Sequence, residues 1–378
     1  MPLTSLRATL GIAGGGQLAR MMVPPAKRLG LDVIVLDPTP DAPAGQLADA
    51  QIVAPFDDAA ALATLAARVD VITYDLEHVD LGALRRLKDA GRRLVPDPEV
   101  LAVLQDKGRQ RAFFDAHGLP GPRFAIDDAP TAAGLAAFGF PLVQKVRTGG
   151  YDGRGVWMHD APGEPVAPVP SLLEARVSLA MELGVMVARG ADGEERTWPA
   201  TELIADPVRH QLDVSLTPAR VPPDVARAAE ALAARAIRAL GGVGVFGVEL
   251  FLDAAGALLL NEIAPRPHNS GHYTIEAAVT DQFEQHVRAV MGLPLGSTEL
   301  LRPAVTANLV GRGHGEARVV GLEAVLAMPG VAVHLYGKRA VRPGRKMGHL
   351  TVMDADLDAA LARARAAQAA IWIEGSQA

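Results

Sequence analysis

The sequence predicts a multidomain α/β protein, and two observations carry this prediction. The chain has 378 residues, more than the roughly 250 to 300 at which a single hydrophobic core stops growing. It opens with an apolar segment over 8–13, a glycine turn at 14–16, helical spacing over 17–29 and a second apolar segment over 32–36. This order is typical of a strand–helix–strand unit, from which α/β folds are built.

Composition excludes several classes of function. The chain carries 37 basic and 43 acidic residues, a formal charge of −6, and no run of basic residues, so a nucleic-acid or membrane-binding surface has no electrostatic support. It has no cysteine, which excludes disulfides, thiolate metal sites and a cysteine nucleophile. Neither an export signal nor an apolar run of ~20 residues is visible. We therefore expect a cytoplasmic protein that binds small molecules.

The next elements follow from hydrophobic spacing and from glycine and proline. A first domain is expected to close near 96–104, and a small unit then leads into a glycine-rich loop and a proline-rich loop at 161–170. The expected helices lie at 59–67, 100–117 and 131–138, and the expected strands at 69–74, 93–95, 124–126 and 141–146.

In the second half, a proline pair with Asp224 begins a helix that Gly241 and Gly242 end. Two apolar segments around a turn at 253–256 predict a hairpin. Further strands are expected at 178–181, 185–189, 197–204, 304–310, 332–336 and 348–353, and a last helix at 356–370.

The N-terminal glycine loop has three interpretations. Gly14-x-Gly16-x-x-Ala19 fits the dinucleotide fingerprint, because it follows a strand, opens a helix and precedes Asp37 at the end of the next strand. However, a helix N-terminus offers free N–H groups to any phosphate. A nicotinamide cofactor, another phosphorylated ligand and a tight turn without ligand all remain open on these residues.

A second glycine loop follows a lysine. Lys145 ends an apolar strand, and four glycines lie within 149–155, without the G-K-[ST] ending of a P-loop. Strand alternation places Lys145 on the face of Val143 and apart from Gln144, and an inward lysine needs an anion. The pattern favours a flap that closes over phosphates rather than a wide hairpin loop.

The hairpin at 245–263 carries two glutamates. If its turn is centred between Ala255 and Gly256, Glu249 lies opposite Glu262, and two carboxylates across a ladder repel each other unless a cation bridges them. Oxygen donors with Asn261 beside them favour Mg²⁺ or Mn²⁺ held together with nucleotide phosphates. The alternative is two exposed glutamates at a rim, and a one-residue slip would break the pairing.

Two polar loops complete the pattern. The first, 264–273, follows the hairpin, and the second, 342–349, presents Arg345 and Lys346 to an anion. Solvated surface charge is the alternative for both loops. The first loop contains Arg266, His268, Asn269 and His272.

A strand lysine, a glycine flap without a Walker ending and a hairpin ending in Asn-Glu resemble an ATP-grasp enzyme. Four motifs, at 14–21, 149–155, 261–272 and 342–350, narrow the resemblance to the N5-carboxyaminoimidazole ribonucleotide synthase family. They are spread in order over essentially the whole chain. The resemblance implies ATP-dependent carboxylation of 5-aminoimidazole ribonucleotide by bicarbonate, through carboxyphosphate, in purine biosynthesis.

The resemblance also implies the fold and the partners. We expect a Rossmann-like domain at 1–104, a small lid subdomain with the flap at 105–175, an α+β nucleotide-binding ATP-grasp domain at 176–300 and a C-terminal appendage at 301–378. The family suggests a homodimer, coupled in function to a carboxyaminoimidazole ribonucleotide mutase. Neither nucleic acid nor membrane is an expected partner.

Site residues are carried over from the resemblance onto matching positions. Those expected to bind ATP are Lys107, Lys145, Gly150, Tyr151, Asp152, Gly153, Arg154, Gly155, Val156, Glu174 at the adenine hinge, Glu182 at the ribose, and Asn261. Those expected to hold Mg²⁺ are Glu249 and Glu262. Arg266, His268, Arg154 and Lys346 are expected to act in catalysis, and Gln17, Glu77, Tyr151, Asp152, Asn269, Arg345 and Lys346 to bind the ribonucleotide.

Three other functions stay open at this point. One is a related ATP-grasp ligase such as the formate-dependent glycinamide ribonucleotide transformylase, and another is a nicotinamide-dependent oxidoreductase. The third is a protein that binds nucleotide without turnover. It is motivated by 202–205, where the Glu-Asn-x-His segment common in the family is missing.

Overall fold

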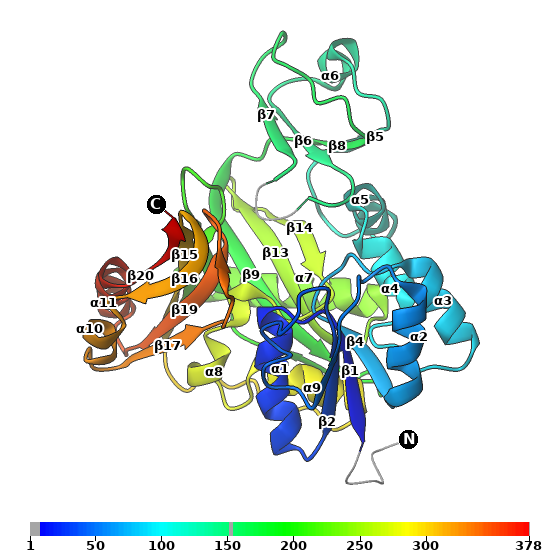
Figure 1. The fold of residues 1–378 in the computed structure, drawn as a ribbon. Helices are drawn as coiled ribbons and strands as arrows, with labels where there is room; N and C mark the ends of the chain where they lie inside the picture. Colours follow the sequence, from blue (N-terminus) through cyan, green and yellow to red (C-terminus); the bar gives the residue numbers. More distant parts are fainter. Residues whose placement is uncertain (1–7, 151–153, 378) are drawn as a thin grey trace.

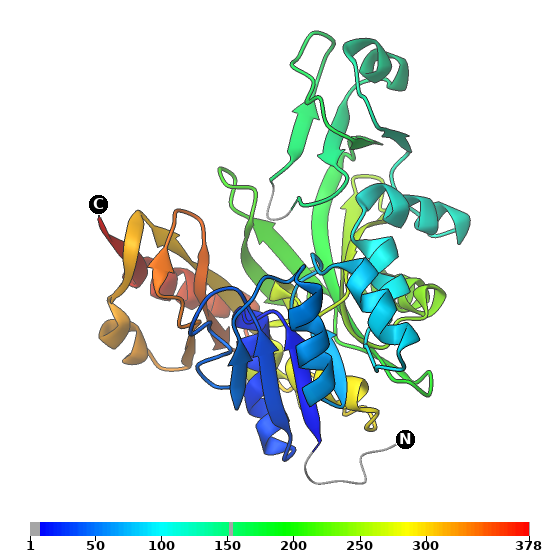
Figure 2. The ribbon, with the colours of Figure 1, turned by 45° about the vertical axis from the view of Figure 1, so that its right-hand side comes forward.

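The structure is a computed structural model that describes residues 8–150 and 154–377 (Figure 1). Its described part contains three β-sheets, two of four strands and one of twelve. In both views of the ribbon, the N-terminal sheet and the large sheet lie next to each other, whereas the third sheet projects away from both (Figure 1 and Figure 2). Within the described part of the chain, no helix has the length and hydropathy that crossing a membrane requires.

The N-terminal sheet is parallel and has the order β3-β2-β1-β4. The chain moves outward from β1 in both directions, and the carboxyl ends of β1 and β4 are therefore the place where α/β sheets bind ligands, here called the N-terminal crevice. The predicted opening unit is confirmed, and a short third strand is added. The elements are β1 (Thr9–Ala13), α1 (Gln17–Arg28), β2 (Asp32–Leu36), β3 (Ala50–Ile52), α2 (Ala59–Arg68), β4 (Val71–Tyr74), α3 (Leu81–Asp89) and α4 (Pro98–Leu104).

The helix predicted over 100–117 is two helices, α4 and α5 (Lys107–Ala116). Asp106 separates them, because its carboxylate accepts hydrogen bonds from the backbone N–H groups of Gly108 (2.8 Å) and Arg109 (3.1 Å). An N-cap of this kind fixes where a helix begins. Lys107 therefore stands at the first turn of α5.

The projecting sheet is antiparallel and has the order β5-β8-β6-β7. It lies at the top of Figure 1 with one helix across it, and a separate small core of Leu135, Leu142 and Leu173 holds it together. The predicted proline-rich loop is the connection between β7 and β8. The elements are β5 (Phe124–Asp127), α6 (Ala132–Phe138), β6 (Leu142–Val146), β7 (Val156–His159) and β8 (Ser171–Ala175).

The large sheet has its carboxylate hairpin at one edge, in the order β14-β13-β9-β11-β12-β15. Two strands were predicted over 178–189, but the structure has one long strand there, because β13 pairs with it without interruption around Gly184. A single strand predicted over 197–204 is broken at Pro199 into two. The elements are β9 (Leu179–Arg189), β10 (Glu195–Thr197), β11 (Thr201–Ala205), β12 (Leu212–Thr217), α7 (Pro223–Leu240), β13 (Gly244–Asp253) and β14 (Leu258–Ala264).

Two helices join the hairpin to its surroundings. α7 buries one face against β9 and β13 in the largest core, and α9 packs between β13 and α1 of the N-terminal sheet. These contacts fix the first sheet relative to the hairpin. The remaining elements are a 3₁₀ turn (Asn269–Gly271), α8 (Thr274–Ala277), α9 (Gln282–Met291), β15 (Ala304–Arg312), β16 (His314–Val320), α10 (Leu322–Leu326), β17 (Val331–Leu335), β18 (Ala340–Val341), β19 (Lys346–Met353), α11 (Leu357–Ala370) and β20 (Trp372–Gln377).

Candidate active site

The predicted carboxylate pair is confirmed: Glu249 of β13 lies opposite Glu262 of β14. The predicted centre of the hairpin turn, between Ala255 and Gly256, is wrong by half a residue. Nearer the turn Leu250 pairs with Leu260, which centres the turn on Ala255. A β-bulge at Asn261 makes up the difference, and without this extra residue Glu249 would face Asn261 instead. The bulge therefore aims both Asn261 and Glu262 towards Glu249, and the Asn261 amide donates a hydrogen bond to Glu249 Oε2 (3.2 Å).

The two carboxylates have opposite electrostatic environments. Burial raises the pKa of Glu249, and the neighbouring charges of Glu262 and Glu182 raise it further. The ammonium of Lys107 contacts Glu262 and holds the pKa of that carboxyl well below its usual range. Burial lowers the pKa of Lys107, but the charges of Glu262 and Glu249 outweigh it and raise that pKa. In the absence of ligand, Glu249 thus favours its protonated form and Glu262 its ionised form.

Lys145 reaches the same place from the projecting sheet. Its Nζ lies 2.7 Å from Glu174 Oε2 and 3.0 Å from Asn261 Oδ1, so the predicted inward lysine has an anionic partner. Gln144 points to the other face of the strand and is fully buried. Glu174 is itself buried in ion pairs with Lys145 and Arg111. Its side chain supports the lysine, and its role at the adenine hinge stays a prediction.

The polar loop after the hairpin brings His268 and Arg266 to the site. His268 Nε2 lies 3.6 Å from Glu249 Oε1. It lies over the strand only because position 247 is glycine, since a Cβ there would come within 2.4 Å of the His268 Cβ. Arg266 Nη2 lies 2.7 Å from Glu77 Oε1, which links the loop to the N-terminal domain. The carboxylate site and the N-terminal crevice are therefore neighbours.

The crevice itself is lined by carboxylates. The backbone N–H of Gly15 donates to Asp37 (2.9 Å) and that of Gly16 donates to Asp75 (2.7 Å), so side chains of the chain already use these donors of the glycine loop. Burial raises the pKa of Asp75 to about 6, although its hydrogen bonds from the loop oppose this. Burial lowers the pKa of Arg345, and the charge of Arg342 lowers it further, while the nearby charge of Asp37 opposes the shift.

Other predicted residues lie around these groups. Gln17 is the first residue of α1, next to the glycine loop. Lys346 begins β19 and is close enough to Glu249 to oppose the rise in its pKa. Glu182 of β9 pairs with Phe251 of β13, on the face of the sheet that carries Glu249. Burial raises the pKa of Glu182.

The remaining predicted residues are placed less directly. Gly150, Arg154 and Gly155 lie at the connection between β6 and β7, and Val156 pairs with Lys145. Asn269 is buried, and both its amide atoms pair with the amide of Asn308 at 2.9 and 2.7 Å. This pair fixes the polar loop, and substrate binding by Asn269 stays a prediction. Tyr151, Asp152 and Gly153 lie outside the described residues.

The donor set suits a hard divalent cation. Glu249, Glu262 and Asn261 offer oxygen atoms from adjoining strands, as Mg²⁺ prefers. Over 8–150 and 154–377 no group of three histidine, aspartate or glutamate side chains forms a metal site by itself. Phosphate oxygens of a nucleotide would have to complete the coordination, which fits a cation that arrives with ATP.

Sequence reasoning missed three residues of this region. Asp75 had a signal, because it directly follows β4 at the ligand-binding end of a parallel sheet. Arg111 had none, since arginine is common in this chain and helical spacing does not show which side chain reaches another domain. Gln282 had none either, although its amide holds the backbone N–H and C=O of His268, each at 2.8 Å.

Comparisons with known proteins agree with this geometry. Family models match in order: a ribonucleotide synthetase preATP-grasp domain at 7–105, an ATP-grasp domain at 112–283 and a phosphoribosylaminoimidazole carboxylase C-terminal domain at 304–363. The N5-carboxyaminoimidazole ribonucleotide synthase of Bacillus subtilis is 40% identical over 354 residues, 92% of this chain and 91% of that protein.

Solved structures extend the likeness to three dimensions. The N5-carboxyaminoimidazole ribonucleotide synthetase of Thermotoga maritima superimposes with a TM-score of 0.91 at 45% identity, covering 98% of this chain and 100% of that one. The Aspergillus clavatus synthase, solved with ADP and 5-aminoimidazole ribonucleotide, has a TM-score of 0.87 at 33% identity, covering 96% and 97%. These matches confirm the ATP-grasp fold class predicted from the sequence.

Proposed function

Because the chain belongs to the N5-carboxyaminoimidazole ribonucleotide synthase family of ATP-grasp ligases, we propose that it carboxylates 5-aminoimidazole ribonucleotide with bicarbonate at the expense of ATP. One observation carries the proposal beyond family membership. Two lysines and a carboxylate pair meet at one place, and Arg266 joins that place to the N-terminal crevice through Glu77. A phosphate-transfer site and a second substrate site are thus adjacent.

The chemistry proceeds in two steps. An oxygen of bicarbonate attacks the γ-phosphorus of ATP, the bond to the β-phosphate oxygen breaks, and ADP leaves with carboxyphosphate formed. The amine nitrogen of the ribonucleotide then bonds to the carboxyl carbon, or to CO₂ released from it, while inorganic phosphate leaves and the nitrogen loses one proton. Such transfers are catalysed by positioning and charge rather than by a covalent nucleophile, which suits a chain without cysteine.

The residues divide by location. Lys107 and Lys145 neutralise ATP phosphates, and Arg266 and His268 orient bicarbonate or carboxyphosphate next to them. Glu249 and Glu262 would hold Mg²⁺, which when bound would neutralise negative charge on the β- and γ-phosphates. The residues proposed to orient the ribonucleotide are Gln17, Glu77, Arg154, Arg345 and Lys346.

The experiment that tests this function compares co-substrates. ADP release is measured with Mg²⁺-ATP and either bicarbonate plus 5-aminoimidazole ribonucleotide or formate plus glycinamide ribonucleotide. We expect stimulation only by the first pair, and ¹⁸O from labelled bicarbonate should appear in inorganic phosphate. Stimulation only by formate and glycinamide ribonucleotide would instead assign the transformylase reaction.

Several finer features belong to the same proposal. We propose a cytoplasmic homodimer that uses Mg²⁺, or Mn²⁺ in its place, and that passes its product to a carboxyaminoimidazole ribonucleotide mutase. A single mass of about 40 kDa by light scattering would contradict the dimer, since the chain itself has a mass of 39.6 kDa. The four-part division at 104, 175 and 300 is part of this proposal as well.

A further inference from the structure

Arg111 connects three parts of the molecule behind the carboxylate site. It stands one helical turn after Lys107 on α5, and its side chain is 3% exposed. Its Nη2 lies 2.5 Å from Glu174 Oε1 in the projecting sheet. Its Nη1 donates to the carbonyl oxygen of Leu260 (2.5 Å) and its Nη2 to that of Asn261 (3.0 Å), both in the hairpin.

The two carbonyl contacts lie at the bulge. β14 is the edge strand of the large sheet, so its outward backbone groups have no neighbouring strand to pair with. The carbonyl of Pro120 accepts from the N–H of Leu260 (2.8 Å), and the Gln110 side chain accepts from the N–H of Ile263 (2.9 Å). Arg111 supplies donors for the carbonyls between them. It therefore holds the backbone at the residue that aims Asn261 and Glu262.

The contact with Glu174 reaches the second lysine. Glu174 lies between two cations, with Lys145 Nζ 2.7 Å from Oε2 and Arg111 on Oε1. Two close ion pairs restrict where this buried carboxylate can lie, and Lys145 is placed by that carboxylate together with Asn261. Both partners of Lys145 are thus held by Arg111.

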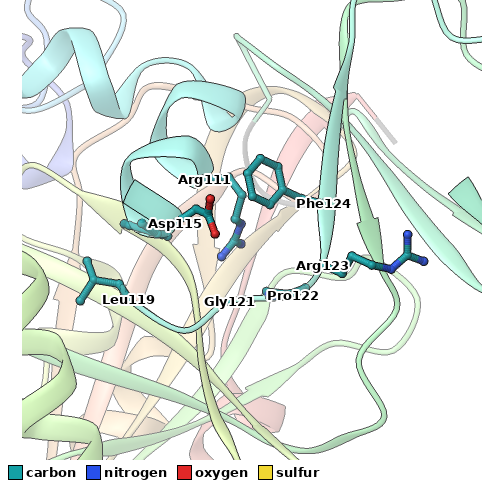
Figure 3. A pocket seen from close by; sticks show the side chains of 8 residues that line it. Arg111, Asp115, Leu119, Gly121, Pro122, Arg123 and Phe124 are labelled. Carbon is teal, nitrogen blue, oxygen red and sulfur yellow. The ribbon is translucent and has the colours of Figure 1, made fainter. Parts of the chain in front are cut away.

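Arg111 itself lies on the far side of these partners. Figure 3 shows its guanidinium beside Asp115 and Phe124, at a pocket of about 290 Å³ that also includes Arg123. The chain passes over the guanidinium at Gly121, where a Cβ would lie 2.3 Å from Nη1. The group is therefore enclosed by protein and acts on the site only through other residues.

We propose that Arg111 is a positioning residue for nucleotide binding, which fixes Lys145 through Glu174 and the metal-binding hairpin through the carbonyls at Asn261. This inference rests on the proposed function, because it takes Lys145 and the hairpin to bind Mg²⁺-ATP. A planar fork with several donors can make these contacts at once, whereas a lysine ammonium cannot span them.

The test uses Arg111→Met and Arg111→Lys, with Arg123→Met as the matched control. Arg123 lines the same pocket, is exposed and has its guanidinium 4.0 Å from the Phe138 ring centroid. The dissociation constant for Mg²⁺-ADP is measured by calorimetry, and the KM values for ATP and for the ribonucleotide by ADP release. We expect Arg111→Met to weaken Mg²⁺-ADP binding at least tenfold and Arg111→Lys to lie between it and the wild type. Arg123→Met should stay within twofold.

These readouts separate positioning from stability. Irreversibly unfolded protein lowers the active fraction without changing the dissociation constant or KM of the folded remainder. At temperatures well below the melting transition, a purely structural role would therefore lower kcat and the melting temperature but leave both constants unchanged. We expect KM for ATP to rise while KM for the ribonucleotide stays within twofold. Unchanged Mg²⁺-ADP affinity in both Arg111 variants would overturn the proposal.

A double-mutant cycle tests the route through Glu174. If Arg111 acts through that carboxylate, the loss of Mg²⁺-ADP affinity in Arg111→Met with Glu174→Gln should be much smaller than the product of the two single losses. A loss equal to the product would overturn this route. The ADP titration needs neither bicarbonate nor ribonucleotide, so a wild type without ribonucleotide-stimulated turnover would refute the proposed function and leave this test intact.

Discussion

The carboxylate pair predicts that two similar substitutions have opposite effects on stability and the same effect on activity. Glu249 and Glu262 face each other across the hairpin, yet burial and the charges of two neighbouring carboxylates disfavour the ionised form of Glu249, whereas Glu262 contacts Lys107. Replacing either carboxylate by glutamine keeps the shape of the side chain and removes its charge. Glu249→Gln should therefore stabilise the ligand-free protein, and Glu262→Gln should destabilise it.

The magnitude follows from the pKa shift of Glu249, which burial and its carboxylate neighbours raise from 4.5 to about 8. One pKa unit corresponds to ~1.4 kcal/mol, but the side chain is 24% exposed and solvent screens part of the effect, so we expect a gain of about 1 to 2 kcal/mol. Below pH 4.5, the pKa in the unfolded chain, the carboxyl is protonated in both states, and its raised pKa does not reduce the stability of the folded state. The cost grows as pH rises towards 8, so the gain in Glu249→Gln should grow over the same window.

The charge of Glu262 has the opposite effect on stability. Lys107 lowers its pKa, so its charge stabilises the folded state above the unfolded pKa, and this stabilisation is lost as pH falls through the folded pKa. Glu262→Gln leaves the Lys107 ammonium without this partner. Because the Glu262 side chain is 38% exposed, screening limits the expected loss to about 1 kcal/mol.

The assay is thermal unfolding without ligand at pH 5 and pH 8, followed by ADP release with all substrates. Because the unfolding entropy of 378 residues is large, Glu249→Gln should melt about 1 to 3 °C above the wild type at pH 8 and near it at pH 5. Both variants should lose at least ~10²-fold in kcat/KM for Mg²⁺-ATP, because each removes a charge from the proposed metal site. If Glu249→Gln melted below the wild type at pH 8, or both variants kept full activity, the reasoning would be refuted.

The remaining predictions concern metal binding and the polar loop. Because a cation must displace the proton of Glu249, the apparent affinity for Mg²⁺ in the presence of ADP should rise several-fold from pH 6 to pH 8, and calorimetry showing no pH dependence would contradict this. Gly247→Ala should displace His268 and lower kcat at least ~10-fold with a folded protein by circular dichroism, whereas wild-type turnover would show that His268 needs no such space. Asn308→Ala should leave the buried amide of Asn269 unpaired and destabilise the protein by about 1 to 3 kcal/mol in urea unfolding, and an unchanged midpoint would mean that the pair does not hold the loop.

Local patterns were sufficient to predict much of the site. Strand alternation placed Lys145 inward, and pairing across the hairpin placed Glu249 opposite Glu262. The second result needed the bulge at Asn261, which hydrophobic alternation does not show. A bulge depends on how an edge strand meets its neighbours, and here those neighbours are side chains of α5, far away in the sequence.

The parts that the sequence did not reveal depend on contacts between distant segments. The break between α4 and α5 is set by the capping carboxylate of Asp106, which also pairs with Arg147 from the projecting sheet (2.6 Å). β12 was missed because Leu212–Thr217 is a short segment whose pairing partners lie elsewhere in the chain. The crevice carboxylate Asp75 needs the topology of the parallel sheet before its role is visible.

The most direct test of the central claim is the fate of the carboxyl carbon. The protein is incubated with Mg²⁺-ATP, ¹⁴C-bicarbonate and 5-aminoimidazole ribonucleotide, and label in the product is compared with ADP formed. We predict acid-labile label in the ribonucleotide at one carbon per ADP, dependent on all three substrates and lost in Glu262→Gln. ADP formed without label in the ribonucleotide, by folded protein that binds ATP, would contradict the account.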